Sequence, residues 1–221
     1  MNEHAVPLIT RITALRHGET AWNVDTRIQG QLDISLNETG RWQASQAGIA
    51  LAVESVDAII SSDLARAYET ALAVAKHHGL DVQIDRDLRE REFGSFQGKT
   101  FAEIEAQMPG DALLWRKRVP DFAPGGGESL LIFRERVVQC LRRLGSQYAG
   151  KHIIVVGHGG VMDIIYRDAT QLDLQAPRTW ALGNASINRV LFNGEHFSLV
   201  GWSDTSHLET EKTKGLDEQH A

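Results

Sequence analysis

The sequence predicts an α/β fold with a mostly parallel central sheet, and two segments carry this prediction. Residues 8–16 mix apolar and β-favouring side chains in a pattern typical of a strand covered on both faces. Residues 153–157 form a second apolar run of the same kind. Each run leads into a histidine followed by glycine, at His17 and at His158. Because residues just past the carboxyl ends of parallel strands line the ligand crevice, we expect the two histidines to lie side by side there.

Length and composition predict one domain. The chain has 221 residues, of which 42% are hydrophobic, and this is enough to bury a substantial core. No internal repeat or linker divides it, so we predict a single domain over residues 1–208 that begins with a frayed end at residues 1–7. Residues 209–221 are polar, and we predict that they form a disordered tail.

Charge and composition argue against several classes of partner. The formal net charge is −6, whereas binding to nucleic acid requires an electropositive surface. No apolar run approaches the roughly 20 residues of a membrane span, and the amino terminus lacks a basic region followed by an apolar one. We therefore predict a cytoplasmic protein without a nucleic-acid or membrane partner. The single cysteine, Cys140, excludes an internal disulfide and a cysteine-based zinc site, and we predict a buried core thiol.

Caps, turns and apolar spacing predict the remaining elements. Asn37 is expected to cap a helix, and an Asn193-Gly194 turn is expected to join the last two strands in a hairpin. Residues 178–182 are ambiguous. The predicted helices cover residues 37–53, 64–78, two short pieces within 100–118, 128–148 and 160–169. The predicted strands after the first cover residues 56–61, 81–84, 152–156, 186–192 and 197–202.

Two further features are candidates for the wall of the crevice. Residues 19–33 show no sustained period and form a predicted loop that carries Asn23, Arg27 and Gln29. Arg66 falls in the first turn of a predicted helix, near unpaired backbone N–H groups and the positive end of the helix dipole. That position favours an anion, so Arg66 is either a functional residue or a structural arginine in an unusual place.

A charged segment, residues 88–98, supplies the candidate acid. Such a segment is normally a solvated loop, but Phe93 and Phe96 interleave with the charges. We expect the loop to fold back over a pocket and to bury one carboxyl group beside these rings. Desolvation favours the protonated form of a carboxyl group, which makes it usable as a general acid near neutral pH. Glu90 or Glu92 is the candidate.

The basic triplet Arg116-Lys117-Arg118 follows a predicted short helix and permits two interpretations. It either meets an acidic group of a substrate or forms the solvated end of that helix. The second interpretation is the more common one for a run of charges.

Five motifs in order make the chain resemble the histidine phosphatase superfamily, also called the phosphoglycerate-mutase-like family. The resemblance extends from Thr10 to about Leu208. The motifs are RHGET with Asn23, the pair Gln29-Gly30, SSDLARAYETA with Arg66, LREREFGSFQG with Glu90, and GHGG with His158.

This resemblance implies a three-layer α/β/α sandwich and a phosphohistidine mechanism that needs no metal or other cofactor. The family's nucleophile falls on His17 and its general acid on Glu90, while His158 completes the catalytic set. The residues that the resemblance assigns to phosphate binding are Arg16, Arg66 and His158, with Asn23, Gln29 and Gly30 beside them and a backbone N–H from Gly159.

The residue types suit that chemistry. A neutral imidazole has a lone pair that can attack phosphorus, and its unperturbed pKa is about 6.5. Two arginines and a second histidine can hold the charge of the equatorial phosphate oxygens in the transition state. Arginine fits this task because its planar fork binds oxyanions in a bidentate manner.

Three alternatives stay open at this point. His17, His158 and Glu90 could be the ligands of a metal-dependent phosphoesterase, although no Asp-rich cluster or close His-x-His spacing supports that. A non-catalytic binder of phosphorylated ligands would be expected to lack a histidine or the glutamate. A phosphoglycerate mutase would need a longer cover than residues 99–124, so the short segment favours a phosphatase. The substrate is predicted to be a small phosphorylated metabolite of unknown identity, and the sequence leaves a homo-oligomer open.

Overall fold

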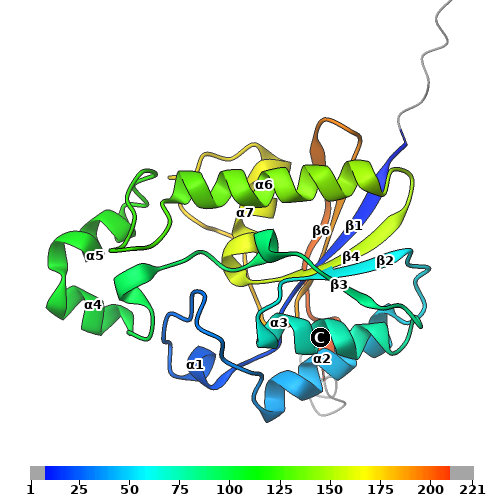
Figure 1. The fold of residues 1–221 in the computed structure, drawn as a ribbon, viewed down its shortest axis with the longest axis horizontal. Helices are drawn as coiled ribbons and strands as arrows, with labels where there is room; N and C mark the ends of the chain where they lie inside the picture. The colour runs from blue at the N-terminus through cyan, green and yellow to red at the C-terminus, as the bar shows by residue number, and fades with distance from the viewer. Residues whose placement is uncertain (1–7, 210–221) are drawn as a thin grey trace, which may run out of the picture.

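The computed structural model describes residues 8–209, which form a six-stranded sheet with helices on both faces (Figure 1). The strand order is β3-β2-β4-β1-β5-β6, and β1 is parallel to β4 but antiparallel to β5. The strands are β1 Thr10–Arg16, β2 Ala58–Ser61, β3 Val82–Ile84, β4 His152–Gly157, β5 Ile187–Phe192 and β6 Phe197–Asp204. The helices are α1 Ala21–Val24, α2 Glu38–Leu51, α3 Ala65–Ala75, α4 Phe101–Gln107, α5 Pro109–Arg116, α6 Leu130–Gln147 and α7 Gly159–Thr170.

Alternation along the central strands produces the three layers. Ile153 and Val155 of β4 point to one face and pack in a core with α6 and α7, whereas Ile154 and Val156 point to the other face and pack with α2 and α3. All four side chains are buried. The predicted mostly parallel sheet inside an α/β/α sandwich is therefore confirmed. The single domain predicted over residues 1–208 stays a prediction, supported by the one sheet that spans Thr10 to Asp204.

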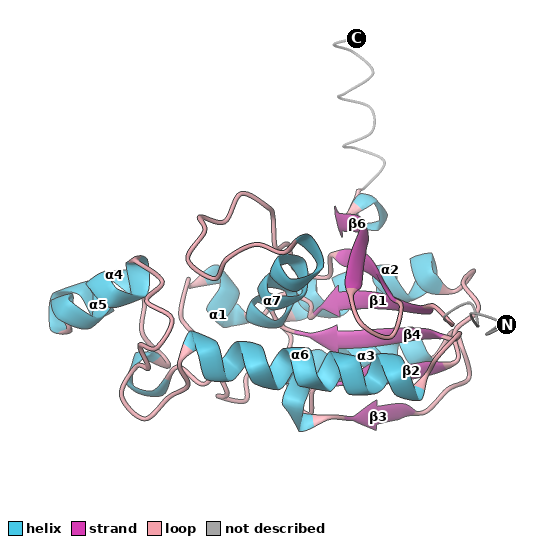
Figure 2. Cartoon of the chain, turned by 90° about the horizontal axis from the view of Figure 1, so that it is seen from above, coloured by secondary structure: helices cyan, strands magenta, loops and turns pink. Residues whose placement is uncertain are grey.

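Helices α4 and α5 lie apart from the sheet, beyond the carboxyl ends of β1 and β4 (Figure 2). This pair, here called the α4–α5 lobe, has its own small core around Phe96, Ile104 and Ala112. Thr100 begins α4 with a capping box and Pro109 begins α5, so the two short helices predicted within residues 100–118 are present.

Several predicted boundaries were wrong for local reasons. The first strand begins at Thr10 because Leu8 and Ile9 are exposed and unpaired in the sheet. The predicted loop 19–33 contains a one-turn helix, α1, which Thr20 caps. The predicted hairpin between β5 and β6 is present, with residues 193–196 between the two strands. The Asn193 side chain accepts hydrogen bonds from the backbone N–H groups of residues 195 and 196.

Other sequence predictions have simpler outcomes. Residues 178–182, which were ambiguous, contain no helix or strand. Asn37 caps α2 as predicted, since its side chain accepts a hydrogen bond from the N–H of Gly40. Among residues 8–209, no helix has both the length and the apolar character needed to cross a bilayer. The frayed end predicted at residues 1–7 and the predicted tail, apart from Glu209, lie outside the described residues.

Candidate active site

The parallel pairing of β1 with β4 places the two histidines together. Arg16 is paired with Gly157 in the register, so the next residue on each strand is His17 and His158. The ring centroids of the two histidines are 5.2 Å apart, and both side chains are buried. The backbone N–H of His17 continues the sheet by donating to the carbonyl oxygen of Gly157. The predicted meeting of two strand-end histidines is confirmed.

The hydrogen bond of His17 orients its ring and leaves one nitrogen free. Nδ1 lies 2.6 Å from the carbonyl oxygen of Gly18, which can only accept, so Nδ1 carries the proton. Nε2 then keeps the lone pair. Burial, followed by the charges of Arg66 and Arg16, holds the pKa of His17 well below its usual value. The imidazole is therefore neutral at pH 7, as a nitrogen nucleophile must be.

His158 is held by Ser62, which the sequence analysis did not single out within the motif SSDLARAYETA. Its Nε2 lies 2.9 Å from the hydroxyl of Ser62, and that hydroxyl accepts a hydrogen bond from the N–H of Leu64. A hydroxyl can donate to Nε2 or accept from it, so this contact fits either tautomer of His158. Nδ1 is buried and has no partner among the described residues. Burial and the charge of Arg66 are the two largest causes that lower the pKa of His158.

Arg66 ties the predicted loop 19–33 to the site. Its guanidinium donates to the carbonyl oxygens of Gly30, at 2.7 Å, and Leu32, at 2.9 Å, while its Nε has no partner. Burial lowers the pKa of Arg66 to about 10. The anion expected at the start of α3 is a side chain of the protein, because the Asp33 carboxylate accepts a hydrogen bond from the N–H of Ala65. Arg66 lines the cavity instead of pairing with that carboxylate.

A cavity of about 170 Å³ lies between these side chains. All the residues assigned to phosphate binding by the family resemblance, except His158, line it together with His17 and Glu90. Those residues are Arg16, Asn23, Gln29, Gly30, Arg66 and Gly159. His158 is not among the lining residues and reaches the site through its contact with the His17 ring.

Buried polar atoms without partners gather around this cavity. They are Nε of Arg16, Nε of Arg66, Nδ1 of His158 and Oε1 of Gln29. A buried polar group without a hydrogen bond costs about 1–3 kcal/mol, so a cluster of such groups indicates a site that a polar ligand completes. Two of the four are guanidinium N–H donors that carry positive charge. The arrangement is suited to a tetrahedral oxyanion.

Glu90, and not Glu92, lines the cavity. Its carboxylate accepts hydrogen bonds from the N–H of Gly160, at 2.9 Å, and from its neighbour Arg91, at 2.8 Å. Gly160 allows this approach, because a Cβ there would clash with Glu90 Oε1. The expected apolar cover is present only in part. Phe93 lines the cavity, whereas Phe96 packs in the core of the α4–α5 lobe.

Two residues that the sequence analysis did not single out position the site. Asn184 donates from its amide to the carbonyl oxygen of His17, at 3.1 Å, and to Oδ1 of Asn23. Arg136 of α6 donates to backbone carbonyl oxygens of residues 87, 89 and 90, which holds the segment that carries Glu90. Neither residue lies in a motif, and both act on backbone atoms, so no local sequence signal would have found them.

The comparisons with known proteins agree with this geometry. The chain matches the family model of the histidine phosphatase superfamily (branch 1) over residues 12–205. The chain belongs to the histidine phosphatase superfamily. It is 40% identical to phosphoglycerate mutase-like protein 4 of Arabidopsis thaliana, covering 90% of this chain and 86% of the relative. It is 38% identical to a metal-independent phosphoserine phosphatase of the same plant, covering 91% and 84%.

A solved structure of this superfamily has the same fold. It is a complex of mycobacterial glucosyl-3-phosphoglycerate phosphatase with VO3, and it is 35% identical to this chain, with a TM-score of 0.79. The alignment covers 88% of this chain and 99% of that one.

The geometry of this histidine phosphatase does not favour the rival metal site. His17, His158 and Glu90 do not bring three ligand atoms within 4.8 Å of one another, a criterion that, among residues 8–209, only Asp85, Asp87 and Cys140 meet. The two histidines also face the charges of Arg16 and Arg66, which repel a cation.

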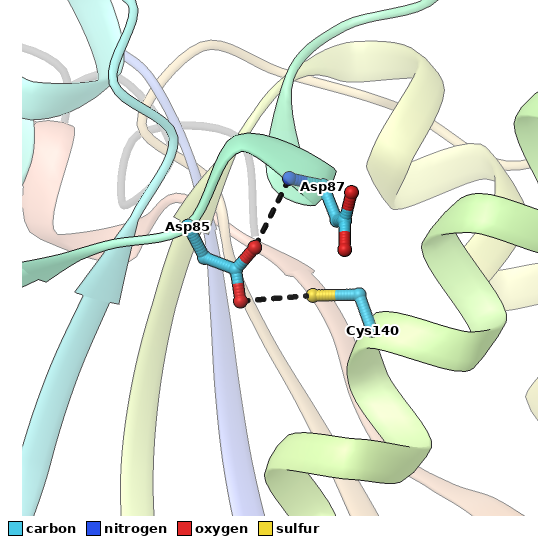
Figure 3. Close-up of side chains that lie close together, drawn as sticks. All are labelled: Asp85, Asp87 and Cys140. Atoms are coloured by element: carbon cyan, nitrogen blue, oxygen red, sulfur yellow. Dashed lines mark hydrogen bonds between the residues drawn. The ribbon is translucent and has the colours of Figure 1, made fainter.

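The cluster that does meet the criterion links the turn after β3 to helix α6 (Figure 3). Asp85 accepts hydrogen bonds from the N–H of Asp87 and from the thiol of Cys140. It also forms an ion pair with Arg143 at 2.6 Å. Burial and the nearby Asp85 raise the pKa of Cys140 far above its usual value. The thiol is therefore protonated, in agreement with the predicted buried core thiol.

We expect the lowered pKa of His17 to make folding depend on pH. Below a pH of about 6.5 the unfolded chain binds a proton at residue 17 that the native protein does not, so the free energy of unfolding falls as the pH is lowered. His17→Asn should make that fall shallower between pH 7 and pH 5, by up to about 1.4 kcal/mol per pH unit. Denaturant melts of both proteins at a series of pH values measure the difference.

His196→Asn is the matched control, because His196 is exposed in the β5–β6 hairpin and lines neither cavity. It should keep the wild-type slope. Identical slopes for wild type and His17→Asn would show that the native site binds a proton at His17 as readily as the unfolded chain does.

Proposed function

We propose that this histidine phosphatase hydrolyses phosphate monoesters through a phosphohistidine on His17. The single observation that carries the proposal is the orientation of the His17 ring. Its Nδ1 proton is engaged by Gly18, so Nε2 has a free lone pair beside a cavity walled by Arg16 and Arg66. The metal-independent phosphoserine phosphatase and the glucosyl-3-phosphoglycerate phosphatase among the relatives support hydrolysis as the reaction.

The first step forms one bond to phosphorus and breaks another. His17 Nε2 attacks the phosphorus while the ester oxygen departs on the opposite side, and the negative charge on the equatorial oxygens is held by Arg16, Arg66 and His158. The backbone N–H of Gly159, at the start of α7, supports the same oxygens. No metal is needed for this step, because the guanidinium groups supply the positive charge.

Glu90 supplies and then removes a proton. Two backbone N–H groups hold its carboxyl group at the wall of the cavity. In its protonated form Glu90 donates to the departing ester oxygen, which leaves as the alcohol. The carboxylate left behind then takes a proton from the water that attacks the phosphohistidine, which releases phosphate and restores His17.

Phosphoryl transfer between 3- and 2-phosphoglycerate is the second candidate function, favoured by the 40% identical phosphoglycerate mutase-like relative. A mutase must keep water from the phosphohistidine while the substrate turns round. Here the cover is limited to the short α4–α5 lobe, and a cavity of about 880 Å³ adjoins the phosphate pocket. We therefore favour hydrolysis. Release of phosphate from 3-phosphoglycerate faster than formation of 2-phosphoglycerate is the result expected of a phosphatase.

Further predictions concern the location of the protein, its partners and its oligomeric state. A cytoplasmic location, a small-molecule phosphate ester as partner, the lack of a nucleic-acid partner and an open oligomeric state stay predictions.

Rapid quenching with a ³²P-labelled monoester tests the intermediate. We expect label that is labile in acid and stable in base, and that maps to His17 by peptide analysis. His17→Ala should lose both the label and turnover. Full turnover without label on residue 17 would contradict the proposal, and label without release of phosphate would favour the mutase.

Glu90→Gln tests the acid. An alkyl alkoxide is a poor leaving group and depends on protonation, whereas an aryl oxide leaves without much help. We expect kcat to fall by about 10²–10³-fold for alkyl phosphates and far less for 4-nitrophenyl phosphate.

Glu92→Gln is the control for this test, since Glu92 does not line the cavity. Its kcat should match that of the wild type for both ester classes. Equal slowing of both classes by Glu90→Gln would remove Glu90 from the role of acid, and a loss confined to alkyl esters in Glu92→Gln would assign that role to Glu92.

A further inference from the structure

A second and larger cavity opens beside the phosphate pocket. Its volume is about 880 Å³, and its walls come from the α4–α5 lobe, from α7 and from residues 177–182. Arg16, Phe93 and Gly159 line both cavities. A phosphoryl group bound at Arg16 therefore lies next to the wall that the two cavities share. Given the proposed phosphatase function, the larger cavity is the place for the departing alcohol.

This cavity is strongly positive although the whole chain has a formal net charge of −6. Five arginines and a single carboxylate, that of Asp163, line it. The Asp163 carboxylate is already neutralised, since it accepts hydrogen bonds from Arg118 at 2.8 Å and from Arg167 at 3.0 Å. The wall therefore has an excess of cations and no free anion among the described residues.

Three of the arginines have fixed structural partners. Arg91 is buried and donates to the carbonyl oxygens of residues 122 and 128. Arg118 donates to the carbonyl oxygen of residue 174 as well as to Asp163. Arg116 pairs with Glu105 at 2.7 Å. The triplet 116–118 is thus split, because Arg116 and Arg118 line the cavity whereas Lys117 is solvated at the end of α5. Lys117 agrees with the interpretation as a solvated helix end, whereas contact of the triplet with an acidic group of a substrate stays a prediction.

Arg178 is different from the others. It lines the cavity, is exposed to solvent, and makes no hydrogen bond or ion pair with any residue in the described part of the chain. It is also close to other positive charge. Burial is the main cause that lowers the pKa of Arg16, and the charge of Arg178 lowers it further. A cation held near Arg16 and Arg118 without a counter-ion leaves an electrostatic cost that a bound anion would remove.

The rest of the wall indicates a ligand of some bulk. Trp180 stacks on Tyr166 with ring centroids 4.0 Å apart, so its position next to Arg178 is fixed. Trp115 of α5 and Phe93, which precedes α4, are in edge-to-face contact and line the cavity. Pockets of roughly 300–1,000 Å³ hold ligands of drug-like size, so this chamber exceeds what a three-carbon alcohol fills.

We propose that Arg178 is a specificity-determining residue that binds a second anionic group, carried by a ring-sized leaving alcohol of the substrate. The phosphoryl group occupies the small cavity at His17, and the second anion, a carboxylate or a phosphate, meets Arg178 in the large one. The substrate class is thus a phosphate monoester with two separated anionic groups.

An isosteric pair of esters tests this claim. Carboxyphenyl phosphate and carbamoylphenyl phosphate have nearly the same size and differ by one negative charge. The 3- and 4-substituted isomers of each ester place the carboxylate or amide at two different distances from the phosphorus. For at least one isomer, we expect the wild type to show kcat/KM about tenfold higher for the carboxylate. Most of that difference should lie in KM and should shrink at high salt.

Variants locate the effect. Arg178→Gln should bring the carboxylate-to-amide ratio of kcat/KM close to one. Arg142→Gln is the matched control, since Arg142 is an exposed arginine of α6 outside the cavity, and it should keep both the wild-type activity and the wild-type ratio. A ring compound with two phosphate groups separates the two anion types when it is added as a competitor. A lower inhibition constant for this compound than the KM of carboxyphenyl phosphate would indicate that the second anion is a phosphate.

The outcomes distinguish this inference from the proposed function. Hydrolysis of all four esters without preference for the carboxylate, or a preference that survives in Arg178→Gln, would overturn the role of Arg178 and leave the phosphatase intact. An equal loss of the ratio in Arg178→Gln and Arg142→Gln would also overturn it, because the effect would then come from net charge alone. Absence of hydrolysis for every ester would count against the proposed function itself.

Discussion

The burial of two arginines beside two histidines is the constraint on which the rest of this site depends. Arg66 and the His17 and His158 rings are withdrawn from water, and Arg16 has a buried Nε without a partner. Burial, and after it the positive charge of Arg66, lowers the pKa values of both histidines. The same positive charge attracts a phosphate dianion. One arrangement thus keeps the nucleophile unprotonated and prepares the pocket for its substrate.

The arginines also hold the protein together around the pocket. Arg66 binds the backbone of Gly30 and Leu32, and Arg16 binds the carbonyl oxygen of Leu182. These contacts fix the loop before α2 and the segment before β5 against the carboxyl edge of the sheet. The nitrogen atoms left over, the Nε atoms of both side chains, point to no protein acceptor. Structural and ligand-binding contacts are therefore divided between different nitrogens of the same guanidinium groups.

The sequence predicted those parts of the site that follow from short-range patterns along the chain. His17 and His158 follow buried strands, and the edge at which parallel strands end is a general property of such sheets. Their meeting was predictable without the structure, as was the helix cap at Asn37. The choice between Glu90 and Glu92 was different. Both stand in the same charged segment, and only the family resemblance, and later the contact of Glu90 with the N–H of Gly160, separated them.

The remaining features depend on contacts between distant segments and left no pattern in the sequence. Ser62 orients His158 from 96 positions away, and Asn184 reaches the His17 carbonyl from 167 positions away. Asp33 takes the helix terminus that the sequence suggested for an external anion. Arg178 lies in a segment without regular structure, where an exposed arginine attracts no notice. Its meaning comes only from the cavity that three separate parts of the chain enclose.

The protonation state of His17 in the empty site is the most direct test of this account. Nitrogen NMR of protein labelled with ¹⁵N-histidine, with the His17 signals assigned by their loss in His17→Asn, reports both ring nitrogens. The account predicts a neutral ring at pH 6 with the proton on Nδ1 and a free lone pair on Nε2. A doubly protonated ring at that pH, or a neutral ring with its proton on Nε2, would contradict it.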